Sequence, residues 1–286
     1  MADFYEVLVL IGIFAGFFVN FVLLWNVLKN RRNVFMKQYN DMVMVEICWD
    51  LFFSMEQLFS QHSLIIMNGV IMFHPSGAER FFVQTNWLYC SFFCHIFTFC
   101  VSMMIQPSLF HYLQCAFVGG TTAVVGVYQL RKRSPEYLRD LLLSMHYDQI
   151  DEVYAVDTQD ISTFIYVFFG IVIGVASIYT TLFYGYNSYR HLQYYAQEAE
   201  NHKLQRQFTF CLAAQAFVSI FFGILPVCTI VSMAFFHRHF EFRGLLVPSA
   251  FLSFANAVLP LSLVTAYRDS LKSMLLTSKP SRIQPN

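Results

Sequence analysis

Charged side chains are scarce in this sequence of 286 residues, where Asp, Glu, Lys and Arg together make up only 13%. Ordinary soluble domains carry about 25%. Acidic and basic residues balance to a formal net charge of zero, so no overall field favours nucleic acid as a partner. Hydrophobic residues account for 57% of the chain. This composition excludes an ordinary soluble domain and indicates an all-α integral membrane protein.

Catalytic and cofactor-binding patterns are also missing. The sequence contains no His-Glu-x-x-His motif and no glycine-rich phosphate loop following a strand. His237, His239 and Glu241 alternate in a short turn, but this spacing is not specific for a metal. The seven cysteines all lie in apolar runs, which favours free thiols over a disulfide framework. We expect no catalytic residues, no metal and no cofactor.

Apolar runs fill most of the chain, and one of them, residues 208–236, contains no charged residue. At about 1.5 Å per residue, a helix of this length exceeds the roughly 30 Å of bilayer hydrocarbon. Pro226 lacks the N–H that a helix needs and predicts a kink within this span. Seven largely apolar segments of this kind predict a seven-transmembrane-helix bundle over residues 1–270. A cytoplasmic tail, 271–286, follows it. The predicted spans are 5–28, 41–59, 81–110, 112–130, 162–186, 208–236 and 244–267.

The fourth span is the weakest, because it is short and holds three glycines. Counting Lys and Arg in the connections favours an N-terminus outside the cell. The same count barely separates seven spans from six, so both arrangements stay open. Residues 60–80 are expected to form an outer loop, whose apolar stretch 65–73 is too short to cross the membrane.

The second span holds three acids, although an acid at the centre of a membrane helix costs about 2.5–3.5 kcal/mol. Glu46 and Asp50 share one face of the helix with Gln57, so this face must meet protein or water. Asp50 also matches the membrane depth of Asn20 in the first span and Asn256 in the seventh. We expect these three to form a polar core. It either couples helix movement to ligand or only holds the bundle together.

Glu56 is expected near the outer end of the second span, where water can reach it. With Gln84 and Asn86 it is a candidate lining for an outer ligand pocket among aromatic side chains. This is a hypothesis from predicted depth in the membrane alone.

Three stretches resemble the nematode serpentine chemoreceptors of the Str superfamily. Leu204-Gln205-Arg206-Gln207, followed by Gln215 and Pro226, is similar to the family's entry into span six. Leu259-Pro260-Leu261 with Ala266-Tyr267-Arg268 is similar to the end of its span seven. Pro107-Ser108-Leu109-Phe110-His111-Tyr112 is similar to its span-three ending, except that His111 stands near where the family tends to carry Arg.

The resemblance implies a G-protein-coupled-type chemosensory (olfactory) receptor in the plasma membrane. It also suggests the membrane of sensory cilia as a location. It implies a small odorant or pheromone-like ligand in the outer half of the bundle, surrounded by membrane lipid, and a heterotrimeric G protein as partner. Pro226 and Pro260 would be hinges. The implied cytoplasmic partner face comprises Phe110, His111, Tyr112, Leu204, Gln205, Tyr267 and Arg268.

Two other functions stay open at this point. A transporter or ligand-gated channel could use the acids of the second span as an ion path, although no inverted repeat is visible. The chain could also be a truncated receptor relative that does not signal, because residues 112–131 are shorter than the corresponding part of the family.

Overall fold

The structure of the protein is a computed structural model, and nine α-helices and one π-helical turn can be given bounds in the part that it describes. Isolated short stretches between residues 136 and 190 are described as well. The described segments are 4–31, 36–60, 62–67, 69–75, 85–103, 109–131, 154–157, 199–236, 240–241 and 247–277. The helices are α1 (Phe4–Lys29), α2 (Lys37–Ser60), α3 (Thr85–Met103), α4 (Leu109–Arg131), α7 (Ala199–Ser219), η3 (Ile220–Ile224), α8 (Leu225–Phe235), α9 (Val247–Ala250), α10 (Leu252–Leu263) and α11 (Thr265–Thr277).

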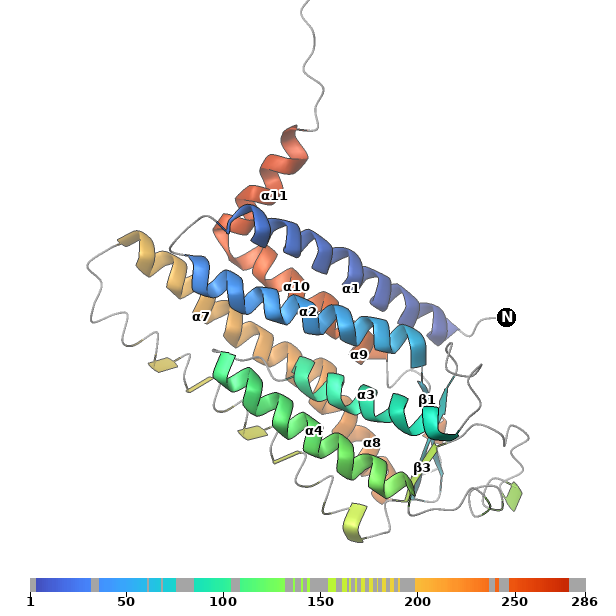
Figure 1. The fold of residues 1–286 in the computed structure, drawn as a ribbon. Coiled ribbons are helices and arrows are strands. Elements are labelled where there is room, and N and C mark those ends of the chain that lie inside the picture. Colours follow the sequence, from blue (N-terminus) through green and yellow to red (C-terminus); the bar gives the residue numbers. More distant parts are fainter. Residues whose placement is uncertain are drawn as a thin grey trace, which may run out of the picture.

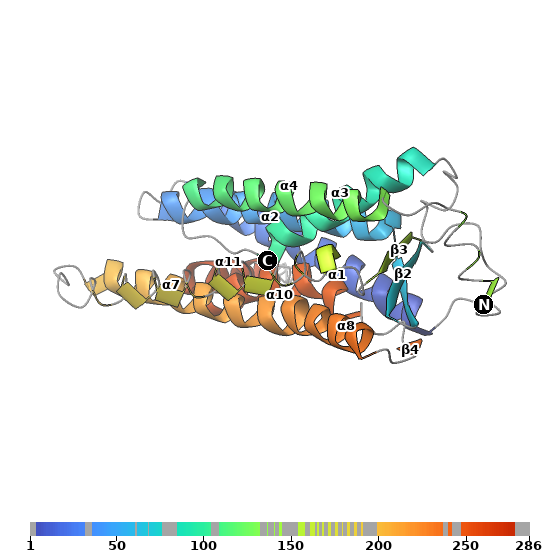
Figure 2. The ribbon, with the colours of Figure 1, turned by 90° about the horizontal axis from the view of Figure 1, so that it is seen from below.

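The long helices lie alongside one another as a bundle (Figures 1 and 2). α1 packs against α2 and α10, α2 packs against α3, α3 against α4, and α7 against α10. In the described part, two helices are long and apolar enough to cross a membrane by length and composition, namely Phe4–Lys29 and Lys203–Phe235. The second is continuous through α7, η3 and α8.

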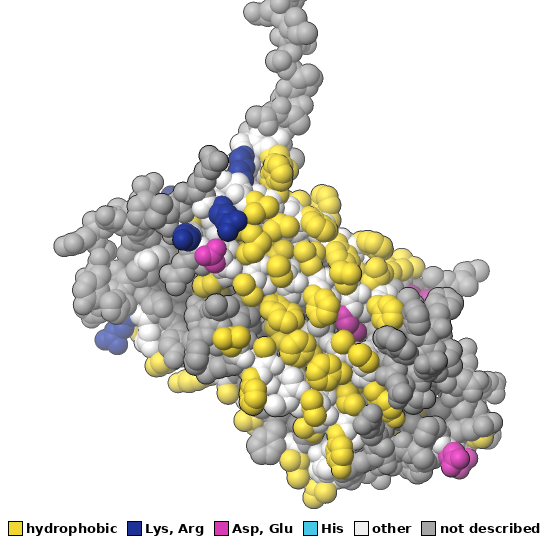
Figure 3. All heavy atoms as spheres, viewed as in Figure 1, with side chains coloured by type: hydrophobic (Ala, Val, Ile, Leu, Met, Phe, Trp, Pro, Cys, Tyr) yellow, Lys and Arg dark blue, Asp and Glu magenta, His cyan; other side chains and the backbone are white. Residues whose placement is uncertain are grey.

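The distribution of apolar side chains on α1 is the one expected next to lipid. Phe14, Phe18, Phe21 and Trp25 are each more than half exposed. The buried side of the same helix instead carries small and polar residues, namely Gly12, Gly16, Asn20 and Asn26 together with apolar neighbours. Figure 3 shows apolar side chains spread over the face that α1 and α2 present, with basic side chains toward the α11 end. Such a continuous apolar surface would be unfavourable in water.

A four-stranded antiparallel sheet lies at the end of the bundle where the chain enters α1 (Figure 1). β1 (His62–Met67) and β2 (Val70–Pro75) form a hairpin, and Gly69 in its turn has a φ of 81°, which favours glycine. β3 (Tyr154–Asp157) pairs with β2, and β4 (Phe240–Glu241) pairs with β1, so the order is β3-β2-β1-β4. Three separate connections between helices therefore meet in one sheet.

The sheet differs from the loop that the sequence predicted for residues 60–80. The Asn68-Gly69 pair is a strong hairpin signal that this prediction overlooked. The hairpin alone would be marginal, and its partners come from connections far away in the sequence. Buried Ile66 and Ile71 also pack onto Ile230 and Ala234 of α8, which fixes the sheet on the bundle. Of the proposed His237, His239 and Glu241 metal motif, only Glu241, in β4, lies within the described residues.

Helix bounds differ from the predicted spans most clearly in the third, sixth and seventh spans, and α7 begins at Ala199 instead of residue 208. The predicted span 81–110 is divided, since α3 ends at Met103 and α4 begins at Leu109. The predicted span 244–267 is interrupted at Val264, and α11 continues to Thr277, into the expected tail. Most of the predicted span 162–186 lies outside the described residues.

The close approach of α1 to the last span generates a first prediction. A Cβ built on Gly12 would lie 3.0 Å from the Phe251 ring and 3.1 Å from the Ala250 backbone, whereas one on Gly120 of α4 meets nothing nearer than 3.9 Å. Gly12→Ala should therefore destabilise the fold by about 1–3 kcal/mol through overpacking. Gly120→Ala is the matched control, and it should be neutral or stabilising because Ala favours helix. The measurement is thermal unfolding of the purified protein, and equal midpoints for the two variants would contradict this packing.

Candidate functional site

The three residues predicted to form a polar core lie together between α1, α2 and α10, and all are buried. The Asn20 side-chain amide donates to the carbonyl oxygens of Gly16, at 3.0 Å, and Ser253, at 3.2 Å. The Ser253 hydroxyl donates to the backbone carbonyl of Asp50, at 3.2 Å. The Asn256 amide donates to Oδ1 of Asp50, at 3.5 Å. Ser253 thus joins the first span to the second, a role that the sequence analysis missed.

Glu46 extends this group toward α7. Nε2 of Gln215 donates to Oε1 of Glu46, at 2.5 Å, and to the carbonyl oxygen of Asn256, at 3.3 Å. Glu46 and Asp50 are one helical turn apart on α2, so both acids face amide donors rather than lipid. We use the name polar core for Asn20, Glu46, Asp50, Gln215, Ser253 and Asn256.

Pro260 explains why Gln215 finds a free acceptor. Proline has no N–H to donate to the carbonyl four residues before it in a helix, which here belongs to Asn256. Gln215 donates to this same carbonyl from α7. Pro260 itself is buried inside α10, and the helix is interrupted four residues later, at Val264, whose backbone is extended. A hinge was predicted at Pro260, and the structure shows the interruption of the helix at Val264.

Gln207 of α7 stabilises that break. Its Oε1 accepts hydrogen bonds from the backbone N–H of Thr265, at 3.1 Å, and from the Thr265 hydroxyl, at 3.0 Å. The first N–H groups of a helix have no partner within the helix, so Gln207 caps the start of α11. Gln207 belongs to the Leu-Gln-x-Gln stretch quoted for the family resemblance, but its role was not predicted.

Near Pro226 the helix is altered without ending. A π-helical turn, η3, precedes Pro226, and the N–H of Leu225 donates to the carbonyl of Ile220, five residues back. Pro226 is buried directly after this turn, and it supplies no N–H to the hydrogen-bond ladder of the continuous helix. The sequence predicted a kink at Pro226, and the structure places a π-helical turn directly before it.

An aromatic group closes the bundle near α11, and we call it the α11-end cluster: Tyr39, Asn40, Phe208 and Tyr267. The Tyr267 hydroxyl donates to Oδ1 of Asn40, at 2.6 Å, and the Asn40 amide donates to the carbonyl of Asn30, at 3.1 Å. The ring of Tyr39 stacks on Phe208, with 3.5 Å between centroids. Tyr267 is fully buried here, so in this conformation it holds helices together instead of offering a surface.

The remaining residues of the predicted partner face are distributed differently. Leu204 is partly buried and packs against the core cluster that includes Tyr267, whereas Gln205 and Arg268 are exposed. The other three lie in the first turn of α4 rather than at the end of α3, and their side chains are outside the described part: Phe110, His111 and Tyr112.

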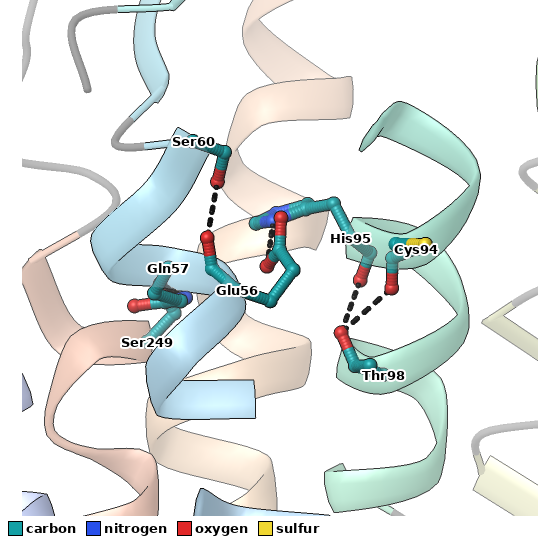
Figure 4. Close-up of polar contacts among 7 residues, drawn as sticks. All are labelled: Glu56, Gln57, Ser60, Cys94, His95, Thr98 and Ser249. Carbon is teal, nitrogen blue, oxygen red and sulfur yellow. Dashed lines mark hydrogen bonds and ion pairs between the residues drawn. The ribbon is translucent and has the colours of Figure 1, made fainter. Parts of the chain in front are cut away.

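At the sheet end, Glu56 of α2 meets His95 of α3 (Figure 4). Nδ1 of His95 lies 2.8 Å from Oε2 of Glu56. We call these two residues the sheet-end pair. The expectation that water reaches Glu56 is wrong, because the residue is only 8% exposed. Its side chain turns toward α3 instead of the end of the bundle.

The structure does not place Glu56 beside its two predicted partners. Gln84 lies outside the described residues, and Asn86 lies in α3 with a side chain that is not described. His95 was missed, although its depth in the third span was the available signal. Next to the pair, Gln57 of α2 donates to the Ser249 hydroxyl of α9, at 3.5 Å.

No disulfide joins the cysteines whose side chains are described, among which Cys211 is buried and Cys48 and Cys90 are exposed. Within the described part of the chain, no three His, Cys, Asp or Glu side chains gather closely enough to hold a metal ion. The described polar groups mainly form hydrogen bonds between neighbouring helices.

The α11-end cluster gives a second prediction. Tyr267→Phe removes the donor to Asn40 Oδ1 and leaves that oxygen buried without its bond, which costs about 1–3 kcal/mol. The thermal unfolding midpoint of the purified variant should fall by several degrees. Tyr179→Phe removes a hydroxyl from a side chain that is 68% exposed and should leave the midpoint unchanged. Equal effects of the two changes would show that the Tyr267–Asn40 bond contributes nothing.

One comparison with known proteins identifies the family. The family model described as serpentine type 7TM GPCR chemoreceptor Str matches residues 108–272, more than half of the chain. No curated protein matches the sequence. The matched part includes α4, α7, α8, α10 and most of α11. The family consists of multi-pass membrane receptors, which are generally not enzymes, and its seven-helix architecture agrees with the helical bundle described above. This chain belongs to the Str family of serpentine seven-transmembrane chemoreceptors of the G-protein-coupled type.

Proposed function

We propose that this protein is a chemosensory receptor that binds a small odorant or pheromone-like ligand in the half of the bundle near the sheet. The signal leaves through the α11 end to a heterotrimeric G protein. The observation that carries this proposal is that α2 contributes to all three polar sites: Glu56 to the sheet-end pair, Asp50 to the polar core and Asn40 to the α11-end cluster.

One rigid helix therefore connects the two ends of the bundle. Glu56 and Asn40 are separated by about 24 Å along the axis of α2, at roughly 1.5 Å per residue. A ligand that prefers one position of α2 relative to α3 would shift the equilibrium between packings of the bundle. The same movement would alter the Tyr267–Asn40 contact near the break at Val264. A helix interrupted at Val264 and a π-helical turn before Pro226 are the positions where the last two spans can bend.

The partner face of this proposal comprises the exposed Gln205 and Arg268 together with the start of α4. Tyr267 would join it only after its bond to Asn40 opens. Phe110, His111 and Tyr112 are assigned to this face because the start of α4 lies at the end of the bundle away from the sheet.

A third prediction tests signalling. The full chain is expressed in cells that carry a G-protein reporter and is exposed to a panel of small odorants, with surface expression measured in parallel. We expect at least one ligand to activate the receptor. Asp50→Asn should reduce its potency about tenfold or more, because it replaces the buried carboxyl group that Asn256 contacts.

Asp41→Asn is the matched control, since Asp41 is exposed and lies on the same helix. If Asp50→Asn left both the ligand response and the surface expression unchanged, the proposed coupling role of the polar core would be contradicted. A ligand-gated current from the protein alone, without G-protein signalling, would favour the channel alternative.

We further propose that the sheet lies outside the cell, with the N-terminus, in the plasma membrane, including that of sensory cilia. Pairing of β1, β2, β3 and β4 supports seven spans, because the connections after α2, α4 and α8 must then lie on one side of the membrane. Six spans would place the connection after α4 on the opposite side from the β1–β2 hairpin.

A fourth prediction follows from this topology. A tag inserted beside Asp148 should react with an impermeant reagent on intact cells, whereas a tag after Asn286 should react only once the cells are permeabilised. If Asp148 were protected and the C-terminus accessible, the chain would have six spans and the proposed partner face would be on the wrong side.

A further inference from the structure

We propose that the ligand recognised at the sheet end is a small organic cation, a protonated amine, whose N–H groups bind the free carboxylate oxygen of Glu56. This inference rests on the proposed receptor function and names the class of ligand for its outer half. The observation behind it is that Glu56 is buried, while among the described residues only one of its two carboxylate oxygens has a hydrogen-bond partner.

The two oxygens of Glu56 have different surroundings. Oε2 lies 2.8 Å from the His95 ring nitrogen, whereas Oε1 is buried and has no hydrogen-bond partner among the described residues (Figure 4). A buried carboxylate oxygen without a donor is costly, so a donor that enters the site gains a strong interaction. Charge-assisted hydrogen bonds from an ammonium group are about twice as strong as neutral ones.

Two phenylalanine rings lie next to the His95 ring of this pair. The His95 ring lies parallel to that of Phe99, at 6.4 Å between centroids and an angle of 2°. Phe53 is buried and lies 6.4 Å from His95 and 6.0 Å from Phe99. Aromatic faces attract ammonium groups and exclude water, which strengthens the attraction to a carboxylate. A carboxylate beside aromatic rings therefore suits an amine better than an anion or a plain hydrocarbon.

Among the long helices, the basic side chains of α1, α2, α7 and α11 lie far from the sheet-end pair. They lie at the end of the bundle opposite the sheet: Lys29, Lys37, Lys203, Arg206, Arg268 and Lys272. An ammonium group placed against Oε1 would supply the donor that this oxygen lacks among the described residues. His95 then acts as a positioning residue, which holds Oε2 so that Oε1 faces the ligand.

A second unpaired group gives the ligand a second contact. The hydroxyl of Ser91 is buried and has no hydrogen-bond partner among the described residues. Ser91 lies four residues before His95 on α3, so both side chains face the same side of that helix. An amine that carries one further polar group near its nitrogen would satisfy both Glu56 and Ser91.

The fifth prediction tests ligand binding directly. The purified full chain in lipid nanodiscs is heated with primary n-alkylamines or with n-alkanols of the same chain lengths, at a pH where the amines are protonated. Amines should raise the unfolding midpoint of the natural protein and of Asp41→Asn, the exposed control on the same helix. For Glu56→Gln the half-maximal amine concentration should rise at least tenfold, while any effect of the alkanols stays the same.

His95 is tested by replacement with and without a donor. His95→Asn keeps an N–H donor on a short side chain and should retain the preference for amines over alkanols, whereas His95→Leu should lose it. A loss that is equal in both variants would indicate a purely structural histidine.

Three results would overturn the inference: equal shifts by amines and alkanols, no shift with any amine at millimolar concentration, or Glu56→Gln responding like the natural protein. If an alkanol activated the receptor in cells with the same potency in Glu56→Gln as in the natural protein, the amine proposal would be refuted and the receptor function would stand. If amines bound through Glu56 but caused no signalling, the amine site would be supported and the proposed receptor function would be refuted.

Discussion

Two carboxylates on the inward face of one membrane helix are the constraint to which the rest of the bundle responds. Asp50 of α2 is buried and Glu46 is partly buried one turn away, so neighbouring helices must supply their hydrogen-bond donors. Asn256 of α10 and Gln215 of α7 each donate an amide hydrogen to one of these acids. This requirement places α7 and α10 beside α2 and brings α1 against them through Asn20 and Ser253.

Where the backbone of one helix is irregular, a polar side chain of a neighbouring helix supplies the missing hydrogen-bond partner. The carbonyl of Asn256, which loses its usual helical donor because of Pro260, accepts a hydrogen bond from Gln215 instead. The break at Val264 is capped by Gln207 of α7, eight residues before Gln215 on the same helix. These pairs join the sixth and seventh spans at two levels. The places where the helices can bend are therefore also the places where they are tied together, which is a suitable arrangement for a receptor with two packings.

Several features could be predicted from sequence because they depend on local composition and depth alone. The apolar runs specified the membrane helices, and the positions of Asn20, Asp50 and Asn256 within them were sufficient to expect one buried group. The pairing of Glu56 with His95 was missed because it depends on the position of α3 along the axis of α2. The sequence of a single helix does not contain this information. The sheet was missed for a related reason, since β3 and β4 come from connections about 80 and 170 residues beyond the hairpin.

The sequence by itself determined that this chain is a helical membrane protein of a chemoreceptor family, because hydropathy and short motifs act over one helix at a time. Only the tertiary structure decided which donor meets which acid, that Tyr267 is buried against Asn40, and that one oxygen of Glu56 has no partner among the described residues. The physical reason is that a hydrogen bond requires a particular distance and direction. These are set by the packing of several helices and cannot be read from the spacing of residues along one of them.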